Sequence, residues 1–259
     1  MKVSAVVICG NEERNISGCL ESVKWCDEIV VVDSMSTDRT VELARKHTDR
    51  IIQRPWTGYV AQKQFALEQA AGDWIFSLDA DERCSPELRE AIARELPRAD
   101  GLAGFEVKRH VYYLGRWINH GGWYPDWKLR LVRRGRARWT GVDPHDRLLA
   151  DGPVARISAD IIHHTYRDFA HQLRIVNHFS DVITDEWIKQ GRRFSLLDAL
   201  FHPPAKFLEC YIWKLGILDG WPGFVIAAAS AFYTFARQVK LREKAASRIP
   251  QGAPREGGP

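Results

Sequence analysis

Hydrophobic and polar positions alternate in blocks along the first hundred residues. Short runs that are apolar throughout have the pattern of parallel strands buried on both faces. Between these runs, apolar side chains recur at helical spacing, as Ile16, Leu20 and Val23 do. This alternation predicts an α/β fold, a mostly parallel sheet flanked by helices. The expected strands are 3–8, 28–32, 50–53 and 74–78, and the expected helices include 15–25, 62–71 and one capped by Ser85 with Pro86 following.

The pattern changes twice after residue 100. Between 101 and 165, strand-like pieces at 104–109 and 128–132 lie among loops rich in Gly and Trp. The last third has helical spacing, at 169–190, 205–218 and 224–239. We therefore expect a catalytic domain over 1–195, a helical appendage over 196–248 and a disordered, Gly- and Pro-rich tail over 249–259.

Composition narrows the class of protein. The net charge of +4 is small for a chain of 259 residues, which does not favour a nucleic-acid partner. The five cysteines have no zinc-site spacing and their number is odd. Because the apolar run at the N-terminus is too short for a secretory signal, we expect free thiols in a reducing cytosol.

Polar clusters follow three of the expected strands. They begin at Asn11, at Asp33 and at Asp79. Ligands of parallel sheets bind beyond the carboxyl ends of the strands. The sequence therefore predicts one site built from all three clusters.

Asp79 and Asp81 are separated by one residue, so in an extended segment both carboxylates point to the same side. A hard divalent cation, Mg²⁺ or Mn²⁺, suits such oxygen ligands and bridges them to substrate phosphates. The alternative is a solvated loop in which Asp79 only caps the next helix. Dehydrogenase and P-loop chemistry is excluded, because acidic rather than Gly-rich segments follow the strands.

Three motifs in this order resemble family 2 glycosyltransferases with the GT-A fold, the Rossmann-like fold of nucleotide-diphospho-sugar transferases. They are VICGNEERNI at 7–16, VDSMSTD at 32–38 and LDADE at 78–82. Further segments, at 54–59, 123–131 and 218–224, resemble the lipopolysaccharide core glucosyltransferases. This subgroup implies transfer of glucose from UDP-glucose to an inner-core heptose in a β linkage.

The resemblance also implies roles for individual residues. Asp33 corresponds to the acid that hydrogen-bonds uracil, Lys63 approaches uracil or phosphate, and Asp81 binds the metal with Asp79. Met35 departs from the usual Gly, and because φ > 0 is costly for Met, we expect the loop to be placed differently. The implied nucleotide-sugar-binding residues are Asn11, Glu12, Glu13, Asp33, Lys63, Asp79 and Ala80.

Inversion at the anomeric carbon needs a general base on the acceptor side. Asp126 is our candidate, with a salt bridge to a neighbouring Arg as the alternative, and Asp143 and Asp146 are lesser candidates. His145 stands where many GT-A enzymes have a metal-binding His, although a lone His is more often structural.

The apolar segment 224–236 is shorter than the roughly 20 residues that span a bilayer. Tryptophans flank it, and a basic run from Arg237 to Arg248 follows. This pattern suits a membrane interface, with packing against the catalytic domain or a dimer partner as the alternative.

We thus expect an inverting, metal-dependent hexosyltransferase, peripheral on the cytoplasmic face of the inner membrane. Its partners are a UDP-sugar donor, a lipid-linked saccharide acceptor and the membrane surface, with no nucleic acid. Two alternatives are a transferase for another cell-envelope acceptor (capsule, O-antigen or polyprenyl phosphate) and a non-catalytic nucleotide-binding scaffold.

Overall fold

The computed structural model describes residues 1–142 and 145–247, without the side chains of His145 and Ser247. The chain divides into two compact units, Met1–Asp168 and Phe169–Pro259. The sequence pattern led us to expect the division after residue 195, one helix later. The difference arises because the helix that begins at Phe169 packs against the last helix of the chain.

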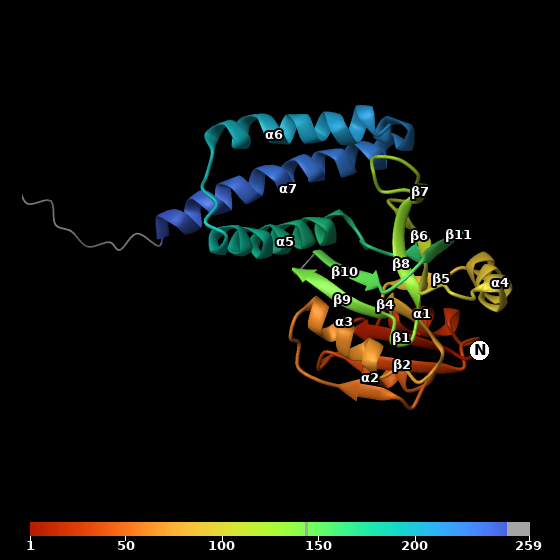
Figure 1. The fold of residues 1–259 in the computed structure, drawn as a ribbon. Coiled ribbons are helices and arrows are strands. Elements are labelled where there is room, and N and C mark those ends of the chain that lie inside the picture. Colours follow the sequence, from red (N-terminus) through yellow and green to blue (C-terminus); the bar gives the residue numbers. More distant parts are fainter. Residues whose placement is uncertain (143–144, 248–259) are drawn as a thin grey trace, which may run out of the picture. The chain divides into compact units, whose positions relative to one another are not determined.

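The first unit is built on a nine-stranded sheet with the order β3-β2-β1-β4-β8-β6-β11-β5, in which β7 pairs with β6 (Figure 1). Six strands are mutually parallel, so the expected mostly parallel sheet is confirmed. The antiparallel strand β8 joins β4 to β6. The parallel strands are β1 (Val3–Cys9), β2 (Glu28–Asp33), β3 (Ile51–Gln53), β4 (Trp74–Asp79), β6 (Gly104–Tyr113) and β11 (Val154–His163).

The antiparallel strands were only partly expected from the sequence. Of these, β8 (Asp126–Arg133) contains the expected strand 128–132, whereas β5 (Glu82–Cys84) and β7 (Arg116–Ile118) lie in segments that we expected to be loops. A separate hairpin is formed by β9 (Ala137–Val142) and β10 (His145–Ala150).

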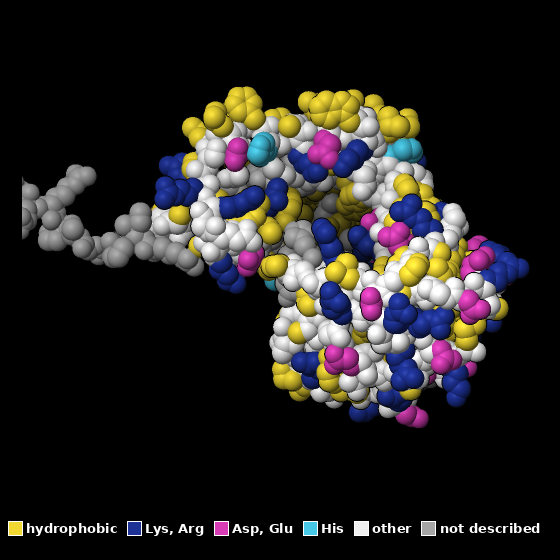
Figure 2. Space-filling view, viewed as in Figure 1, with side chains coloured by type: hydrophobic (Ala, Val, Ile, Leu, Met, Phe, Trp, Pro, Cys, Tyr) yellow, Lys and Arg dark blue, Asp and Glu magenta, His cyan; other side chains and the backbone are white. Residues whose placement is uncertain are grey.

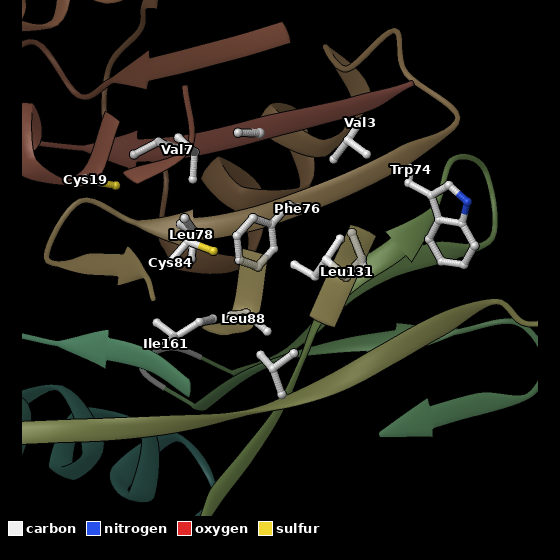
Figure 3. Packing of buried hydrophobic residues seen from close by; sticks show 14 of the residues in the cluster. Val3, Val7, Cys19, Trp74, Phe76, Leu78, Cys84, Leu88, Leu131 and Ile161 are labelled. Atoms are coloured by element: carbon white, nitrogen blue, oxygen red, sulfur yellow. The ribbon is translucent and has the colours of Figure 1, made fainter. Parts of the chain in front are cut away.

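Helices cover the sheet and enclose its core. They are α1 (Ile16–Ser22), α2 (Thr40–Ala44), α3 (Tyr59–Glu68) and α4 (Pro86–Glu95), followed by the short η1 (Leu96–Arg98). Ser85 caps α4, since its hydroxyl accepts a hydrogen bond from the backbone N–H of Leu88 at 3.1 Å. Figure 3 shows Phe76 and Leu78 of β4 packing with Leu88 of α4 and Ile161 of β11. This core fixes the strands whose ends carry the polar clusters.

The second unit is helical. It contains α5 (Phe169–Lys189), α6 (Leu196–Leu208), the π-helical turn η2 (Glu209–Trp213), the 3₁₀ turn η3 (Gly216–Asp219) and α7 (Gly220–Ser247). α7 packs against both α5 and α6 and lies between them (Figure 1). Ion pairs join α7 to α5, such as Lys240–Asp181 and Lys244–Asp185, both at 2.7 Å.

Two further expectations are that no helix of this unit spans a membrane by itself and that the cysteines are free. Among the described residues, no single helix is long and apolar enough to cross a membrane, whereas the bent pair Leu196–Trp213 and Gly216–Ala246 meets the criteria of length and composition together. All five cysteines are free thiols, as expected.

Candidate active site

The expected polar clusters meet at one edge of the sheet. Cys9 pairs with Asp33 across β1 and β2, and Ile8 pairs with Asp79 across β1 and β4. The ends of β6 and β11 lie at the same edge, and so does the start of β8, where Asp126 pairs with Arg109. The strand register thus brings the three clusters to one edge of the sheet, as expected, and their use as one binding site stays a prediction.

Hydrogen bonds join the loop after β1 to the loop after β2. The Oδ1 atom of Asn11 accepts a bond from the backbone N–H of Thr37 at 2.9 Å, and the backbone N–H of Glu12 donates to Oγ1 of Thr40 at 2.7 Å. The backbone N–H of Glu13 donates to Asp38. Burial is the main cause that raises the pKa of the Glu12 carboxyl. These contacts hold Asn11, Glu12 and Glu13 against the loop that follows β2, and the two loops together form one wall of the candidate site.

Met35 adopts the left-handed conformation that we expected it to avoid. Its φ is 60°, and Asn11, in the facing loop, has a φ of 56°. Met35 is 54% exposed, so its side chain does not add a packing conflict. Met35 therefore takes the backbone conformation that a glycine would take here, in a turn where Asp33 accepts a hydrogen bond from the backbone N–H of Ser36, and a different placement of the loop stays a prediction.

Asp33 is fully buried and organises this turn. Its Oδ2 accepts hydrogen bonds from the backbone N–H of Ser36 at 2.9 Å and from Nε2 of Gln53 at 3.0 Å. Burial, followed by the charge of Asp33, raises the pKa of the neighbouring Cys9 thiol. The contact of Asp33 with uracil stays a prediction, and the structure adds that this carboxylate shapes its own loop.

Lys63 of α3 lies between two carboxylates. Its Nζ is 3.0 Å from Oδ1 of Asp79 and 2.9 Å from Oδ2 of Asp146, and it lies 4.7 Å from the ring centroid of Trp139. Lys63 is only 6% exposed. A buried ammonium group is stabilised by such partners, so α3 and the β9–β10 hairpin are both tied to the end of β4.

Arg130 of β8 is the second cation on Asp79. Its Nη2 lies 3.0 Å from Oδ2 of Asp79 and 2.7 Å from Oε1 of the fully buried Glu82. Burial by itself would raise the pKa of Asp79, but the charges of Lys63 and then Arg130 outweigh it and hold the pKa well below its usual range. Asp79 is therefore ionised and held between two positive groups.

The ion pairs continue from Glu82 to the candidate base. Nη1 of Arg109 lies 3.5 Å from Oε1 of Glu82, and its Nη2 donates to Oδ2 of Asp126 at 2.8 Å. Nζ of Lys128 lies 3.0 Å from Oδ1 of Asp126. The salt bridge considered as the alternative for Asp126 is thus present, and its role as a base stays a prediction.

Asp81 lies beside a histidine that the sequence interpretation did not select. Oδ2 of Asp81 is 3.2 Å from Nε2 of His163, and Oγ1 of Thr165 is 2.6 Å from Nδ1 of the same ring. The side chain of Asp81 is 26% exposed, whereas His163 is nearly buried, with a side chain 11% exposed. His163 is the last residue of β11, and a strand at 154–163 could have pointed to it as a residue of the site. The irregular hydrophobic pattern of this region did not predict that strand.

A divalent cation fits this part of the site in its donor chemistry. A carboxylate oxygen ligates Mg²⁺ or Mn²⁺, whereas an imidazole nitrogen suits a transition metal such as Mn²⁺ better than Mg²⁺, and the Thr165 hydroxyl can orient the ring from behind. No three of His, Cys, Asp and Glu among the described residues are grouped so as to hold a metal by themselves. The assignment of Asp79 and Asp81 as metal ligands stays a prediction, while the side chain of His145, like Asp143, lies outside the described residues.

Arg130 also has two buried donor atoms without a partner in the described part of the chain. Nε and Nη1 of Arg130 have no hydrogen-bond partner among the described residues, although the side chain is only 4% exposed. Buried donors of this kind favour negatively charged oxygens. Lys63 and Arg130 are both paired with carboxylates, of Asp79, Asp146 and Glu82, so the end of β4 holds a network of paired charges, and its use for phosphate groups stays a prediction.

Comparison with known proteins identifies the family. The family model described as Glycosyl transferase family 2 matches residues 4–150. The chain is 34% identical over 94% of its length to the lipopolysaccharide core biosynthesis glycosyltransferase LpsC of Rhizobium meliloti (strain 1021), of which 93% is covered. It is 29% identical, over 93% of this chain and 87% of the relative, to an uncharacterized glycosyltransferase of Rickettsia typhi.

Among solved structures, S. aureus TarS 1-349 in complex with UDP-GlcNAc matches with a TM-score of 0.52 and 15% identity, over 95% of this chain and 92% of that chain. This likeness concerns the fold alone. Together with the family match it confirms the GT-A fold that the three motifs predicted. The chain is a member of glycosyl transferase family 2.

Proposed function

We propose that this chain transfers glucose from UDP-glucose to an inner-core heptose of lipopolysaccharide, with inversion at the anomeric carbon. Support for the pathway comes from the similarity to LpsC, which extends over 94% of the chain. Support for a diphosphate donor comes from the site. The observation that carries it is the position of Lys63 and Arg130 on either side of Asp79 at the carboxyl edge of the sheet.

The donor would bind with its nucleoside against the wall formed by Asn11, Glu12, Glu13 and Asp33. Its diphosphate would lie over the end of β4, close to the ion pairs of Lys63 and Arg130 with Asp79. A Mg²⁺ or Mn²⁺ ion bound by Asp81 and His163 would neutralise charge on the departing diphosphate. This assignment gives Asp79 a different task from Asp81, because two cations already hold its carboxylate.

The transfer step follows from the place of Asp126 at the same edge. The acceptor hydroxyl forms a bond to the anomeric carbon while the bond from that carbon to the diphosphate oxygen breaks, and UDP leaves with the bonding electrons. Asp126 takes the hydroxyl proton as attack proceeds. Arg109 donates two hydrogen bonds to Oδ2 of Asp126, at 3.0 and 2.8 Å, and thereby fixes the orientation of the carboxylate.

The proposal includes a peripheral site of action on the cytoplasmic face of the inner membrane. The five free thiols agree with a reducing compartment. A lipid-anchored acceptor would also require the enzyme to work close to the membrane surface.

Product analysis tests the proposal. Purified protein is incubated with UDP-glucose, UDP-galactose or UDP-GlcNAc and a core acceptor that ends in heptose, and the product is examined by mass spectrometry and NMR. We expect one added glucose in β linkage. A product with another sugar would overturn the donor, and turnover only with a heptose-free acceptor would overturn the core assignment. UDP binding without any turnover would favour a scaffold.

A further inference from the structure

The surface formed by α6, η2, η3 and the start of α7 is unusually apolar for a face exposed to water. Figure 2 shows hydrophobic side chains gathered over α6. Monomeric soluble proteins rarely expose large contiguous apolar patches, and such patches mark interaction surfaces. Its exposed large hydrophobic residues are Leu196, Leu197, Leu200, Phe201, Leu208, Ile212, Trp213, Leu215, Ile217, Leu218, Trp221 and Phe224. We call this set the α6 surface.

Helical spacing explains why these side chains share one face. Leu197, Phe201, Leu208 and Ile212 recur at intervals that are close to whole turns. Residues on the opposite side, such as Ala199, are buried where α6 packs against α7. One face of α6 is therefore used to fold the unit, and the other is left apolar and exposed.

The segment 218–224, singled out in the sequence, builds a tight corner at the end of this surface. A Cβ atom added to Gly223 would lie 1.8 Å from the carbonyl oxygen of Gly216, so the two glycines must touch. Gly220 has a φ of 62°. The corner directs Trp213 and Trp221 outward, with exposed fractions of 74% and 70%.

Part of the apolar segment of α7 is buried and therefore cannot contact a membrane. Val225, Ile226, Ala227 and Ala229 of α7 are buried. Much of the run 224–236, which the sequence led us to assign to a membrane interface, is therefore used inside the helical unit. The exposed apolar surface lies mainly on α6 and at the corner, in a segment expected to be helical only from residue 205.

Charges lie at the border of the α6 surface. Lys206 and Lys214 both pair with Glu209, and His202 lies 3.7 Å from Asp198. Arg192 and Arg193 are exposed just before α6, and basic residues outnumber acidic ones in the second unit. An apolar face with exposed Trp and bordering Arg and Lys is typical of helices that lie in the interface of a bilayer with anionic lipids.

We infer that the α6 surface inserts into the headgroup region of an anionic membrane, with α6 parallel to the bilayer and Trp213 and Trp221 at its deepest corner. The inference rests on the proposed function for the identity of the membrane, whereas lipid binding is measured without donor or acceptor. A second copy of the chain is the competing occupant, and it predicts a dimer in solution in place of lipid binding.

Vesicle flotation with the full chain tests this. The vesicles contain phosphatidylethanolamine and phosphatidylglycerol, or phosphatidylcholine alone. We expect the wild type to bind the anionic vesicles, and Phe201→Asp or Trp221→Ala to weaken this binding about tenfold or more. Val154→Asp is the matched control, because Val154 is 40% exposed at the start of β11, at the edge opposite the active site, and it should bind as the wild type does.

Circular dichroism and size-exclusion light scattering establish whether each variant is folded and whether it is a monomer. Equal binding by all variants, or no binding by the wild type, would overturn the inference. A wild-type dimer that Phe201→Asp makes monomeric, with no lipid binding, would assign the surface to a second copy. Turnover of a water-soluble heptose acceptor is measured in parallel, so that loss of lipid binding and failure of the proposed function are distinguished.

Discussion

Nζ of Lys63 in α3 lies 3.0 Å from Oδ1 of Asp79 at the end of β4. Through Asp79 the ion pairs pass to Arg130, Glu82, Arg109 and finally Asp126. The expected donor side and the expected acceptor side of the site are thereby joined in one chain of charges. A change at one member should affect both stability and activity, to an extent that depends on its burial.

Arg130 should matter most for stability. Arg130→Met leaves Asp79 with only Lys63 and leaves Glu82 with the more distant Arg109. Removing one partner of a buried ion pair costs about 3–5 kcal/mol, so we expect the free energy of unfolding in urea to fall by about that amount. Arg156→Met is the control, because Arg156 pairs with Glu106 but its side chain is 62% exposed, and its loss should cost less than about 1 kcal/mol. Similar losses in the two variants would contradict this.

The low pKa of Asp79 predicts how stability depends on pH. Since its pKa is lower in the folded protein than in the unfolded chain, the stabilisation is fully present above the unfolded value of about 3.9 and declines as pH falls below it. Compared with Asp79→Asn, the wild type should lose up to about 1.4 kcal/mol per pH unit below pH ~4. A difference in free energy of unfolding that stays constant from pH 6 to pH 3 would show that the carboxylate is not stabilised.

Much of the donor side was predictable because it is local in sequence. β1, β2 and β4 are mostly apolar runs, and a polar cluster lies at the end of each. The pairing of Glu82 with Arg130 was not predictable, since 48 positions separate them and β8 lies between β4 and β6 only through tertiary contacts. The start of α6 was missed because Pro203 and Pro204 lie inside the helix, and Pro usually ends one.

His163 should contribute to metal binding. We expect His163→Ala to raise the Mn²⁺ concentration needed for half-maximal activity by about 10–100-fold, because one ligand is lost while the nucleotide site remains. Isothermal titration of Mn²⁺ in the presence of UDP provides a readout independent of turnover. His202→Ala, at an exposed position of α6, is the control. An unchanged Mn²⁺ affinity in His163→Ala would exclude this residue as a ligand.

Asp126 should act in the transfer step and not in donor binding. We expect Asp126→Asn to lower kcat by about 10²–10⁴-fold, since an amide cannot accept the acceptor proton, while the Kd for UDP stays unchanged. Asp151→Asn serves as the matched control, because its side chain is 84% exposed. A fall in UDP affinity with little change in kcat would indicate that the contact with Arg109 is structural.

The central claim is that the edge of the sheet around Asp79 binds a UDP-sugar for transfer to a saccharide. The most direct test is UDP release by the purified wild type and Asp81→Asn, with a panel of UDP-sugars, with and without heptose-containing core acceptor, in Mn²⁺, Mg²⁺ or EDTA. We predict rapid release only when UDP-glucose, acceptor and metal are all present, and a large loss in Asp81→Asn. Full activity of Asp81→Asn or in EDTA would contradict the metal site, and no release with any donor would contradict the transferase.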